Sequence, residues 1–456
     1  MSGSDKNNNV AADGSAFAPD TVSAIAPENI LGTPPEEPPA EQEIAPDLAR
    51  PRGLISVFRH RNYRLFFAGQ LVSLMGSWMQ NTAQPWLVYS LTHSTVLLGV
   101  TSFCSTVPVF LMTPFGGMVA DRVDRRKFLL FTQSAAMLQA TVLAVLTLSG
   151  HVKVWEIICL ALTMGLINSF DIPSRQSMTL DMVGREDLRH AISLNSMMFN
   201  MARIVGPTLA GMLIYAVGEG ICFAFNAVSF GAVLISLFLM KLAERPPRIA
   251  QNALRAIAEG YRYSFRSPQI RLSLLLVAVS SLFGAAYVTM MPAVARDLLH
   301  GNSLTQGTLM ASSGGGALIG AYLLSRIAEK QLLYAPVLAG VGFGLGLIAF
   351  SHSHWLWLSV LLLLPTSASL MLLGGTTNTI IQMVAAENFR GRVISHYTQS
   401  FMGMMPWGAL LLGTLGARLG VTDAISIGGA IVLGSALFAF YYRRATGFTL
   451  THAPAE

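Results

Sequence analysis

This sequence contains little charge. Only 12% of its 456 residues are Asp, Glu, Lys or Arg, whereas 52% are hydrophobic, and the mean hydropathy is +0.53. A chain with so little charge cannot coat the surface of a water-soluble domain of this size. The composition therefore predicts a polytopic membrane protein. The net charge of +6 does not indicate a nucleic-acid partner, because the distribution of the charge matters more than its total.

Cysteine is also scarce, and clusters of catalytic residue types are missing. Cys104, Cys159 and Cys222 all lie in apolar segments, a pattern that gives neither a disulfide framework nor a metal-ligand spacing. The nine histidines are scattered, and the sequence contains no nucleotide-binding loop of the form GxxxxGK[ST]. We therefore expect neither an enzyme nor an ATP-driven pump, and we expect no cofactor and no metal site.

Residues 1–50 differ from the rest of the chain. They contain seven prolines and nine acidic residues and show no helical periodicity. This composition predicts a disordered tail, with a regulatory or partner-binding tail as the alternative. The tail lacks the apolar core of a cleavable signal peptide, so we expect the first membrane helix to act as the targeting signal.

Twelve apolar segments follow the tail. Each is long enough to cross about 30 Å of hydrocarbon as a helix, and each is too uniformly apolar for the alternating strands of a membrane barrel. The fold class is therefore predicted to be an all-α membrane protein. The predicted segments are 64–91, 96–119, 128–149, 154–177, 190–217, 221–243, 271–294, 305–328, 332–351, 354–383, 393–416 and 421–442.

An internal duplication predicts two pseudo-symmetric bundles of six helices. The segment MVGREDLRHAI at 182–192 and the segment MVAAENFRGRV at 383–393 share Met, Val, Glu and Arg at an offset of 201 residues. Parallel halves of this kind are typical of transporters, in which the substrate path lies between the halves. The predicted domains are the tail 1–50, a bundle at 51–243, a cytoplasmic linker at 244–270, a bundle at 271–444 and a tail at 445–456.

Basic residues predict the orientation of the chain and the role of the linker. If the amino terminus is cytoplasmic, 25 of the 30 Lys and Arg residues fall on the cytoplasmic side. The positive-inside rule then places both termini in the cytoplasm. Within the linker, the periodicity of 250–266 predicts an amphipathic helix on the inner leaflet that tethers the halves, with lipid sensing as the alternative.

A compact charged motif, GMVADRVDRRK at 117–127, lies between the second and third predicted helices. It resembles the loop motif of the major facilitator superfamily, although Asp124 stands where that family usually has Gly. The resemblance implies gating by conformational change, with the acid latching against the eleventh helix. A purely topogenic basic loop is the alternative. The matching residues are Gly117, Asp121, Arg122, Arg125 and Arg126.

The fifth predicted helix carries ARIVGPTLAG at 202–211, which is similar to an antiporter signature of the same superfamily with two Gly replaced by Ala. Gly206, Pro207 and Gly211 are the matching gating candidates. The resemblance implies exchange and hence export, whereas the alternative is an ordinary kinked helix. The stretches at 170–177, 186–196, 258–268 and 390–393 further resemble the branch that contains enterobactin-type siderophore exporters and macrolide-efflux-like proteins.

Charge inside the membrane is expensive and therefore marks candidate functional residues. Asp171 is either a proton-coupling group or half of a permanent ion pair with Arg125 or Arg203. Arg203 either binds an anionic group on the substrate or only neutralises Asp171. His396 is a second proton-coupling candidate.

Polar side chains on the first predicted helix recur at spacings of three and four, which places Gln70, Ser73, Ser77, Asn81 and Gln84 along one face. Such a stripe either lines a water-filled path or bonds to a neighbouring helix. Apolar walls with scattered polar groups suit amphiphilic organic solutes. Further cavity candidates are Asn168, Asn200, Arg203, Phe283, Tyr287, Asn378 and Gln382.

Together these features predict a monomeric secondary transporter of the bacterial inner membrane. We expect it to exchange a small molecule, drug-like or siderophore-like, for protons by alternating access. The alternatives are an uptake transporter for a small metabolite and a non-transporting membrane sensor or scaffold.

Overall fold

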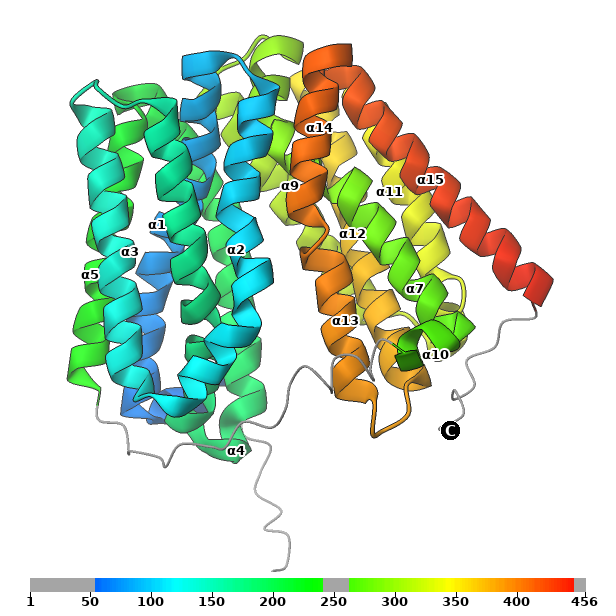
Figure 1. Ribbon diagram of the computed structural model, residues 1–456, viewed down its shortest axis with the longest axis horizontal. Helices are drawn as coiled ribbons and strands as arrows, with labels where there is room; N and C mark the ends of the chain where they lie inside the picture. Colours follow the sequence, from blue (N-terminus) through cyan, green and yellow to red (C-terminus); the bar gives the residue numbers. More distant parts are fainter. Residues whose placement is uncertain (1–53, 241–261, 447–456) are drawn as a thin grey trace, which may run out of the picture. The chain divides into compact units, whose positions relative to one another are not determined.

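A computed structural model describes residues 54–240 and 262–446, and every regular element in these ranges is helical (Figure 1). The description omits seven side chains within the helices, those of Leu54, Pro114, Ala120, Asp121, Arg122, Arg185 and Thr446. The predicted tails and most of the predicted amphipathic linker helix lie outside the described residues. Only residues 262–266 of that linker helix are seen, and they are helical.

The first half of the chain, residues 54–240, provides six crossing segments. Gly184, with φ of 72° and ψ of −179°, breaks the long helix α4 into the spans Val154–Gly184 and Glu186–Val217. Such a positive φ suits glycine because it has no Cβ. The elements are η1 (Leu54–Arg59), α1 (Arg61–Thr92), α2 (Thr95–Arg122), α3 (Arg125–Leu148), α4 (Val154–Val217) and α5 (Glu219–Leu239).

The second half, residues 262–446, provides six more crossing segments. Its first segment, Pro268–Leu298, changes between α, π and 3-10 geometry, and its fifth, Arg390–Leu419, is interrupted after Met402. The elements are α7 (Pro268–Val279), η2 (Ser280–Gly284), η3 (Ala285–Met290), α8 (Met291–Ala293), η4 (Val294–Leu298), α9 (Ser303–Leu324), α10 (Glu329–Leu332), α11 (Ala335–Ser351), α12 (Leu356–Val384), α13 (Arg390–Met402), α14 (Met405–Leu419) and α15 (Val421–Thr446).

The predicted fold class is confirmed, and most predicted boundaries lie within a few residues of the observed ones. In the described ranges, nine helices are long and apolar enough to cross a membrane on their own, and α1, α9 and α11 complete the twelve segments. Large apolar side chains are exposed on the outward faces, as on Phe131, Val228 and Leu338. Lipid chains would cover these side chains, so their exposure fits membrane embedding.

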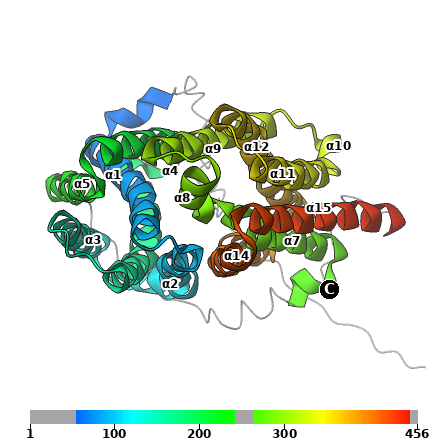
Figure 2. The ribbon, with the colours of Figure 1, turned by 90° about the horizontal axis from the view of Figure 1, so that it is seen from above.

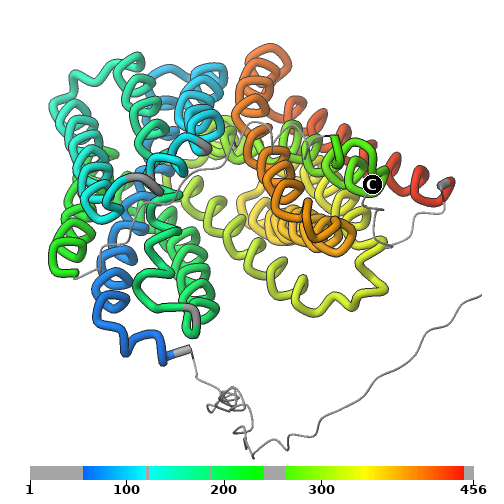
Figure 3. The backbone as a smooth tube through the Cα atoms, turned by 60° about the horizontal axis from the view of Figure 1, so that its bottom comes forward, coloured from blue at the N-terminus to red at the C-terminus, as the bar shows by residue number. Residues whose placement is uncertain are grey.

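Helices pack mainly within their own half. In the first half, α1 and α3 both contact α4 and α5, and in the second half, α9 contacts α12 while α11 contacts α12 and α15. The halves meet mainly through two helix pairs, α2 with α14 and α4 with α9. Figure 2 shows α4 beside α9, and Figure 3 follows the backbone through both halves. The predicted domain boundaries within the linker stay a prediction.

Candidate functional site

Hydrogen bonds join the two halves at the end of the helices where α1 leads into α2 and η4 leads into α9. We call this the closed end. The Tyr89 hydroxyl at the end of α1 donates to the Asp297 carboxylate on η4. Deeper along α1, the Gln306 side chain of α9 donates to the Thr82 carbonyl over 3.1 Å. α1 is therefore tied to the second half at two levels.

Two further hydrogen bonds join the halves at this end, one in each helix pair that links them. The Thr95 hydroxyl at the start of α2 donates to the Gly413 carbonyl of α14 over 2.9 Å. The Ser303 hydroxyl at the start of α9 donates to the Gly211 carbonyl of α4 over 3.0 Å. In each case the first residue of a helix bonds to a glycine in the other half, so both helix pairs that link the halves close in the same way.

These helix pairs cross with their backbones in contact, because glycines occupy the crossing points. A Cβ added at Gly413 would lie 2.6 Å from the Thr95 carbonyl oxygen, and one at Gly211 would lie 2.7 Å from the Ser303 carbonyl oxygen. A Cβ at Gly307 of α9 would lie 2.6 Å from the Pro207 carbonyl oxygen. Small residues thus permit the closest possible approach of the halves.

The antiporter-like segment of α4 makes contacts on two faces. Gly206 packs against α1, since a Cβ there would lie 2.5 Å from the Trp78 Cβ, while Pro207 and Gly211 pack against α9. The helix continues through Pro207 without a non-helical residue at that point. The structure therefore brings the three predicted gating residues of this segment to one junction between α1, α4 and α9.

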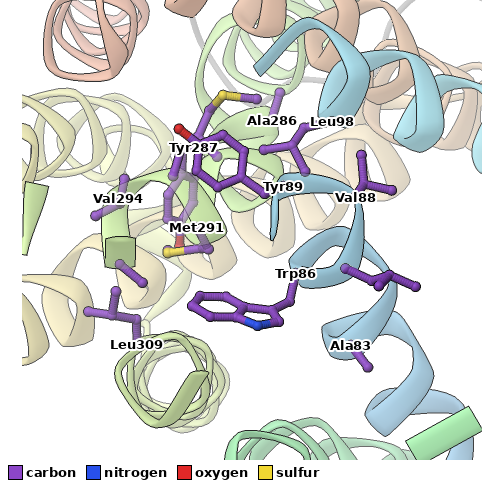
Figure 4. Close-up of a cluster of buried hydrophobic side chains, with 14 of the residues drawn as sticks. Ala83, Trp86, Val88, Tyr89, Leu98, Ala286, Tyr287, Met291, Val294 and Leu309 are labelled. Carbon is purple, nitrogen blue, oxygen red and sulfur yellow. The ribbon is translucent and has the colours of Figure 1, made fainter. Parts of the chain in front are cut away.

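A single buried apolar cluster fills the space between the halves next to the closed end (Figure 4). Trp86, Tyr89 and Leu98 come from the first half, and Met291 and Leu309 come from the second. Figure 4 shows the indole ring of Trp86 between α1 and the second-half side chains Met291 and Leu309. We call these buried side chains the apolar plug.

Asp171 is buried on α4 with 1% of its surface exposed, and all its partners lie in the first half. It accepts hydrogen bonds from the Thr132 hydroxyl over 2.8 Å and from the Gln133 amide over 2.7 Å, and it forms an ion pair with Arg175. The prediction that Asp171 forms its ion pair with Arg125 or Arg203 is wrong. Arg175 lies one helical turn away on the same helix, where i,i+4 spacing brings the two side chains together.

The charged loop between α2 and α3 is held by local contacts. Arg125 forms an ion pair with Asp181 at 2.8 Å, and Arg126 donates to the carbonyls of Leu237 and Phe238 at the end of α5, both over 2.8 Å. Asp124 accepts from the backbone N–H groups of residues 126 and 127 and so caps α3. The departure from the family motif at Asp124 thus has a structural role.

Three predicted residues of this loop motif need separate comment. Asp121 and Arg122 form the last turn of α2, but their side chains lie outside the description, so the latch stays a prediction. Gly117 makes no close helix approach, since a Cβ there would meet no atom of the described residues within 4 Å. The neighbouring Gly116 has that role, because its added Cβ would lie 2.2 Å from the Ser169 carbonyl oxygen.

At the end of the helices opposite the closed end, Asp187 holds the segment that precedes α1. The carboxylate is completely buried and lies 2.9 Å from both the Arg59 guanidinium and the His60 ring, while the Ser56 hydroxyl donates to it over 3.2 Å. We call this group of four residues the Asp187 clamp. It fixes η1 against α4 just after the break at Gly184.

In the second half, the segment before α7 is held by an aromatic contact and a hydrogen bond in place of ion pairs. Tyr263 stacks on Phe389 with ring centroids 4.4 Å apart, and its hydroxyl accepts from the Ala386 N–H over 3.0 Å. The predicted proton-coupling residue His396 is buried, with Nδ1 3.0 Å from the Ser264 hydroxyl.

The polar stripe predicted on α1 is exposed only in part. Gln70 and Gln84 are buried, Ser77 is half-buried and Asn81 is exposed. The Gln70 Oε1 atom is buried and has no hydrogen-bond partner among the described residues. An unsatisfied buried oxygen of this kind is uncommon and marks Gln70 as a position where a ligand or water would be favoured.

The other predicted cavity residues differ in their surroundings. Tyr287 is fully buried, and its hydroxyl lies 3.0 Å from each of the Ser313 and Ser367 hydroxyls. Asn378 Oδ1 is buried without a described partner, and the Asn200 amide donates to the Ser196 carbonyl over 2.8 Å. Their role in substrate binding stays a prediction.

Sequence reasoning missed the residues that bond the halves together at the closed end: Thr82, Tyr89, Thr95, Asp297, Ser303 and Gln306. Two signals in the sequence point to this region. Asp297 is an acid near the end of an otherwise apolar segment, and glycines recur at spacings that suit helix crossings in α4, α9 and α14. In the part of the chain that the structure describes, no group of three or more His, Cys, Asp or Glu residues could hold a metal ion.

Comparison with known families matches residues 53–449 to the family described as "Transmembrane secretion effector". Among curated relatives, the staphyloferrin A transporter of Staphylococcus aureus is 25% identical over 391 residues, which cover 84% of this chain and 96% of the relative. The enterobactin exporter EntS of Salmonella choleraesuis is 24% identical over 376 residues, covering 81% of this chain and 89% of the relative.

Solved structures share the fold at low sequence identity. A bacterial homologue of the human lysosomal transporter Spinster, in an inward-facing and unoccupied conformation, has a TM-score of 0.67 at 14% identity and covers 87% of this chain and 99% of its own. A point mutant of the nucleoside transporter NupG has a TM-score of 0.65 at 11% identity and covers 86% of this chain and 99% of its own.

Proposed function

This chain belongs to the transmembrane secretion effector family of the major facilitator superfamily, and on that basis we propose that it exports a siderophore-like or drug-like small molecule by alternating access. It is a multi-pass membrane transporter and not an enzyme. The observation that carries the proposal is the closed end, where a few hydrogen bonds join two halves whose helices pack mainly within their own half.

The contacts at the closed end suit a gate. Each is a single neutral or singly charged hydrogen bond, and a bond of this kind contributes about 0.5–3 kcal/mol. The backbone crossings at glycine carry no long side chains that would have to repack. A few such contacts can be broken and re-formed during each transport cycle.

The distribution of basic residues supports an inward-open assignment. Under the positive-inside rule, both chain termini and the Asp187 clamp lie on the cytoplasmic side, and the closed end lies on the periplasmic side. A substrate would then enter from the cytoplasm between the halves. In the opposite state, the Asp121 latch would hold the cytoplasmic side closed, with Arg122, Arg125 and Arg126 in the same loop.

Two features support export over uptake. The α4 segment that resembles the antiporter signature forms the junction of α1, α4 and α9, as a gating element should. Curated relatives that the chain matches over most of their length are named as exporters of enterobactin. We therefore propose substrate efflux in exchange for protons entering from the periplasm.

Asp171 and His396 are the proposed proton-coupling residues. As an anion, Asp171 already has three donors, whereas His396 has a hydroxyl partner at Nδ1 and a ring that can carry either charge state. Transport by variants of each residue decides which of the two carries the proton. A coupling residue is identified when its neutral variant, Asp171→Asn or His396→Asn, keeps substrate counterflow but loses proton-driven accumulation.

Inverted membrane vesicles provide the test of direction. We expect substrate accumulation inside such vesicles when a proton gradient is imposed, and collapse of the accumulation when an uncoupler is added. Catecholate and carboxylate siderophores and a panel of amphiphilic drugs serve as substrates. Accumulation confined to right-side-out vesicles would show uptake, and transport in neither orientation would favour a sensor or scaffold.

A further inference from the structure

Arg203 has no ion pair and no hydrogen bond from its side chain to any other described residue, although it lies within a membrane-spanning segment. Its candidate counterions are engaged elsewhere. Asp171 pairs with Arg175, Asp181 pairs with Arg125, and Asp187 lies in the clamp with Arg59. A guanidinium without a counterion in this environment is costly, so its retention calls for a ligand.

The helical register directs Arg203 between the halves. Successive residues of an α-helix are about 100° apart around the axis. Phe199 and Gly206 mark the face of α4 that meets α1, because both contact Trp78, whereas Pro207 and Gly211 mark the face that meets α9. Arg203 falls between these faces and therefore projects toward the junction of α1, α4 and α9.

A backbone contact with the second half lies at the level of Arg203. The Arg203 carbonyl oxygen would lie 3.2 Å from a Cβ added at Gly314 on α9. On the second-half side, the buried Tyr287 hydroxyl is held by Ser313 of α9 and Ser367 of α12, and these two hydroxyls also bond to each other.

We propose that Arg203 is the recognition residue for a negatively charged group of the substrate, such as a carboxylate or catecholate, bound between the halves below the closed end. This inference rests on the proposed transport function and specifies the class of substrate. A guanidinium offers five donors in a planar fork and can bind two oxygens of such a group at once. Asn81 on α1, whose side chain is exposed, and Asn200 on α4 lie on the helices that border this position.

The proposal also links binding to gating. Arg203 belongs to the same turn of α4 as Gly206 and Pro207, which touch α1 and α9. An anion that draws the guanidinium toward it acts on the helix that carries the Gly211–Ser303 contact. The anion would therefore bind on α4 about two helical turns from the Gly211–Ser303 hydrogen bond, which must break when the closed end opens.

The test compares two ligands that differ in charge at one group, 2,3-dihydroxybenzoate and 2,3-dihydroxybenzamide. Their dissociation constants are measured by tryptophan fluorescence with the full-length protein in lipid nanodiscs, because Trp78 adjoins the site. We expect the wild type to bind the acid more tightly than the amide. In Arg203→Gln, the affinity for the acid should fall roughly tenfold or more, with little change for the amide.

Two further variants make the result specific. Arg203→Lys keeps the charge without the planar fork, so it should recover part of the preference for the acid. Arg418→Gln removes an exposed cation in the last turn of α14 and should leave the affinities for the acid and the amide unchanged. Equal binding of the acid by wild type and Arg203→Gln, or no preference for the acid in the wild type, would overturn the proposal.

The outcomes also separate this proposal from export itself. If inverted vesicles accumulate amphiphilic drugs while Arg203→Gln discriminates acid from amide as the wild type does, export stands and the anion site fails. If the preference depends on Arg203 but inverted vesicles accumulate nothing, the anion site stands and export fails.

Discussion

Asn195 and His396 occupy equivalent positions in the two halves, 201 residues apart, which is also the offset between the duplicated sequence motifs. The Tyr63 hydroxyl donates to Asn195 Oδ1 over 3.1 Å, and the Ser264 hydroxyl lies 3.0 Å from His396 Nδ1. Tyr63 and Ser264 are themselves 201 residues apart. The same side-chain contact is therefore made twice, and it supports a duplicated architecture independently of the motifs.

The first prediction replaces His396 of the second half with asparagine, the residue at the equivalent position of the first half. His396→Asn installs the residue found at position 195, and its amide can still bond to the buried Ser264 hydroxyl. We expect a loss of less than about 1 kcal/mol in stability. His396→Leu should cost about 1–3 kcal/mol more, because it leaves that hydroxyl unsatisfied. Thermal unfolding in nanodiscs measures both, and equal melting temperatures for the two variants would contradict the role of this bond.

The second prediction concerns the closed end. Tyr89→Phe removes the hydrogen bond to Asp297 but keeps the ring in the apolar plug. Loss of about 1 kcal/mol should raise the population in which this end is open by roughly fivefold. Spin labels on Leu91→Cys and Leu419→Cys, in a background without the native cysteines, report the distance across this end.

Tyr215→Phe is the matched control for that measurement. It deletes a hydroxyl from a tyrosine that is 64% exposed and should leave the distance distribution unchanged. If Tyr89→Phe also leaves the distribution as in the wild type, the Tyr89–Asp297 bond does not contribute to gating.

The third prediction addresses the glycine crossings. Gly307→Ala places a methyl group 2.6 Å from the Pro207 carbonyl oxygen, so the halves must separate locally, at a cost of about 1–3 kcal/mol. Gly231→Ala is the control, since an added Cβ there meets no atom within 4 Å. Because alanine favours the helix by up to about 1 kcal/mol, the control should be neutral or stabilising.

These effects are read from melting temperatures and from transport rates. Gly307→Ala should lower both, whereas Gly231→Ala should lower neither. A Gly307→Ala protein as stable and active as its control would show that close backbone contact is not needed at this crossing.

The fourth prediction tests the buried pair on α4. Asp171→Asn leaves the Arg175 guanidinium without its anion and should destabilise the protein by about 3–5 kcal/mol. Adding Arg175→Gln removes the stranded charge and should recover most of that loss. Thermal unfolding of the single and double variants gives the coupling energy. Additive losses in the double variant would show that the two side chains do not depend on each other.

Much of the fold could be predicted from sequence, because long apolar segments and the positions of charged turns are set by the cost of placing charge in lipid. Side-chain partners were harder to predict. The pairing of Asp171 with Arg175 follows from i,i+4 spacing, whereas the predicted ion-pair partners were Arg125 and Arg203. The choice between Gly116 and Gly117 depends on the rotation of α2, which apolar composition does not determine.

The candidate site was predictable only where it coincided with a motif. Gly206, Pro207 and Gly211 were found through their pattern, and the structure places them together. The Tyr89–Asp297 bond joins residues 208 positions apart and matches no local pattern. Contacts of this kind depend on how the two halves meet, and this information is not present in either half alone.

The Asp187 clamp has a mechanical consequence. Because Ser56, Arg59 and His60 all hold one buried carboxylate, a pull on the amino-terminal segment is transmitted to α4 before it reaches α1. The load then falls beside Gly184, the one non-helical residue of that 64-residue helix. A force applied at the front of the chain would therefore bend the molecule at the junction of its fourth and fifth spans.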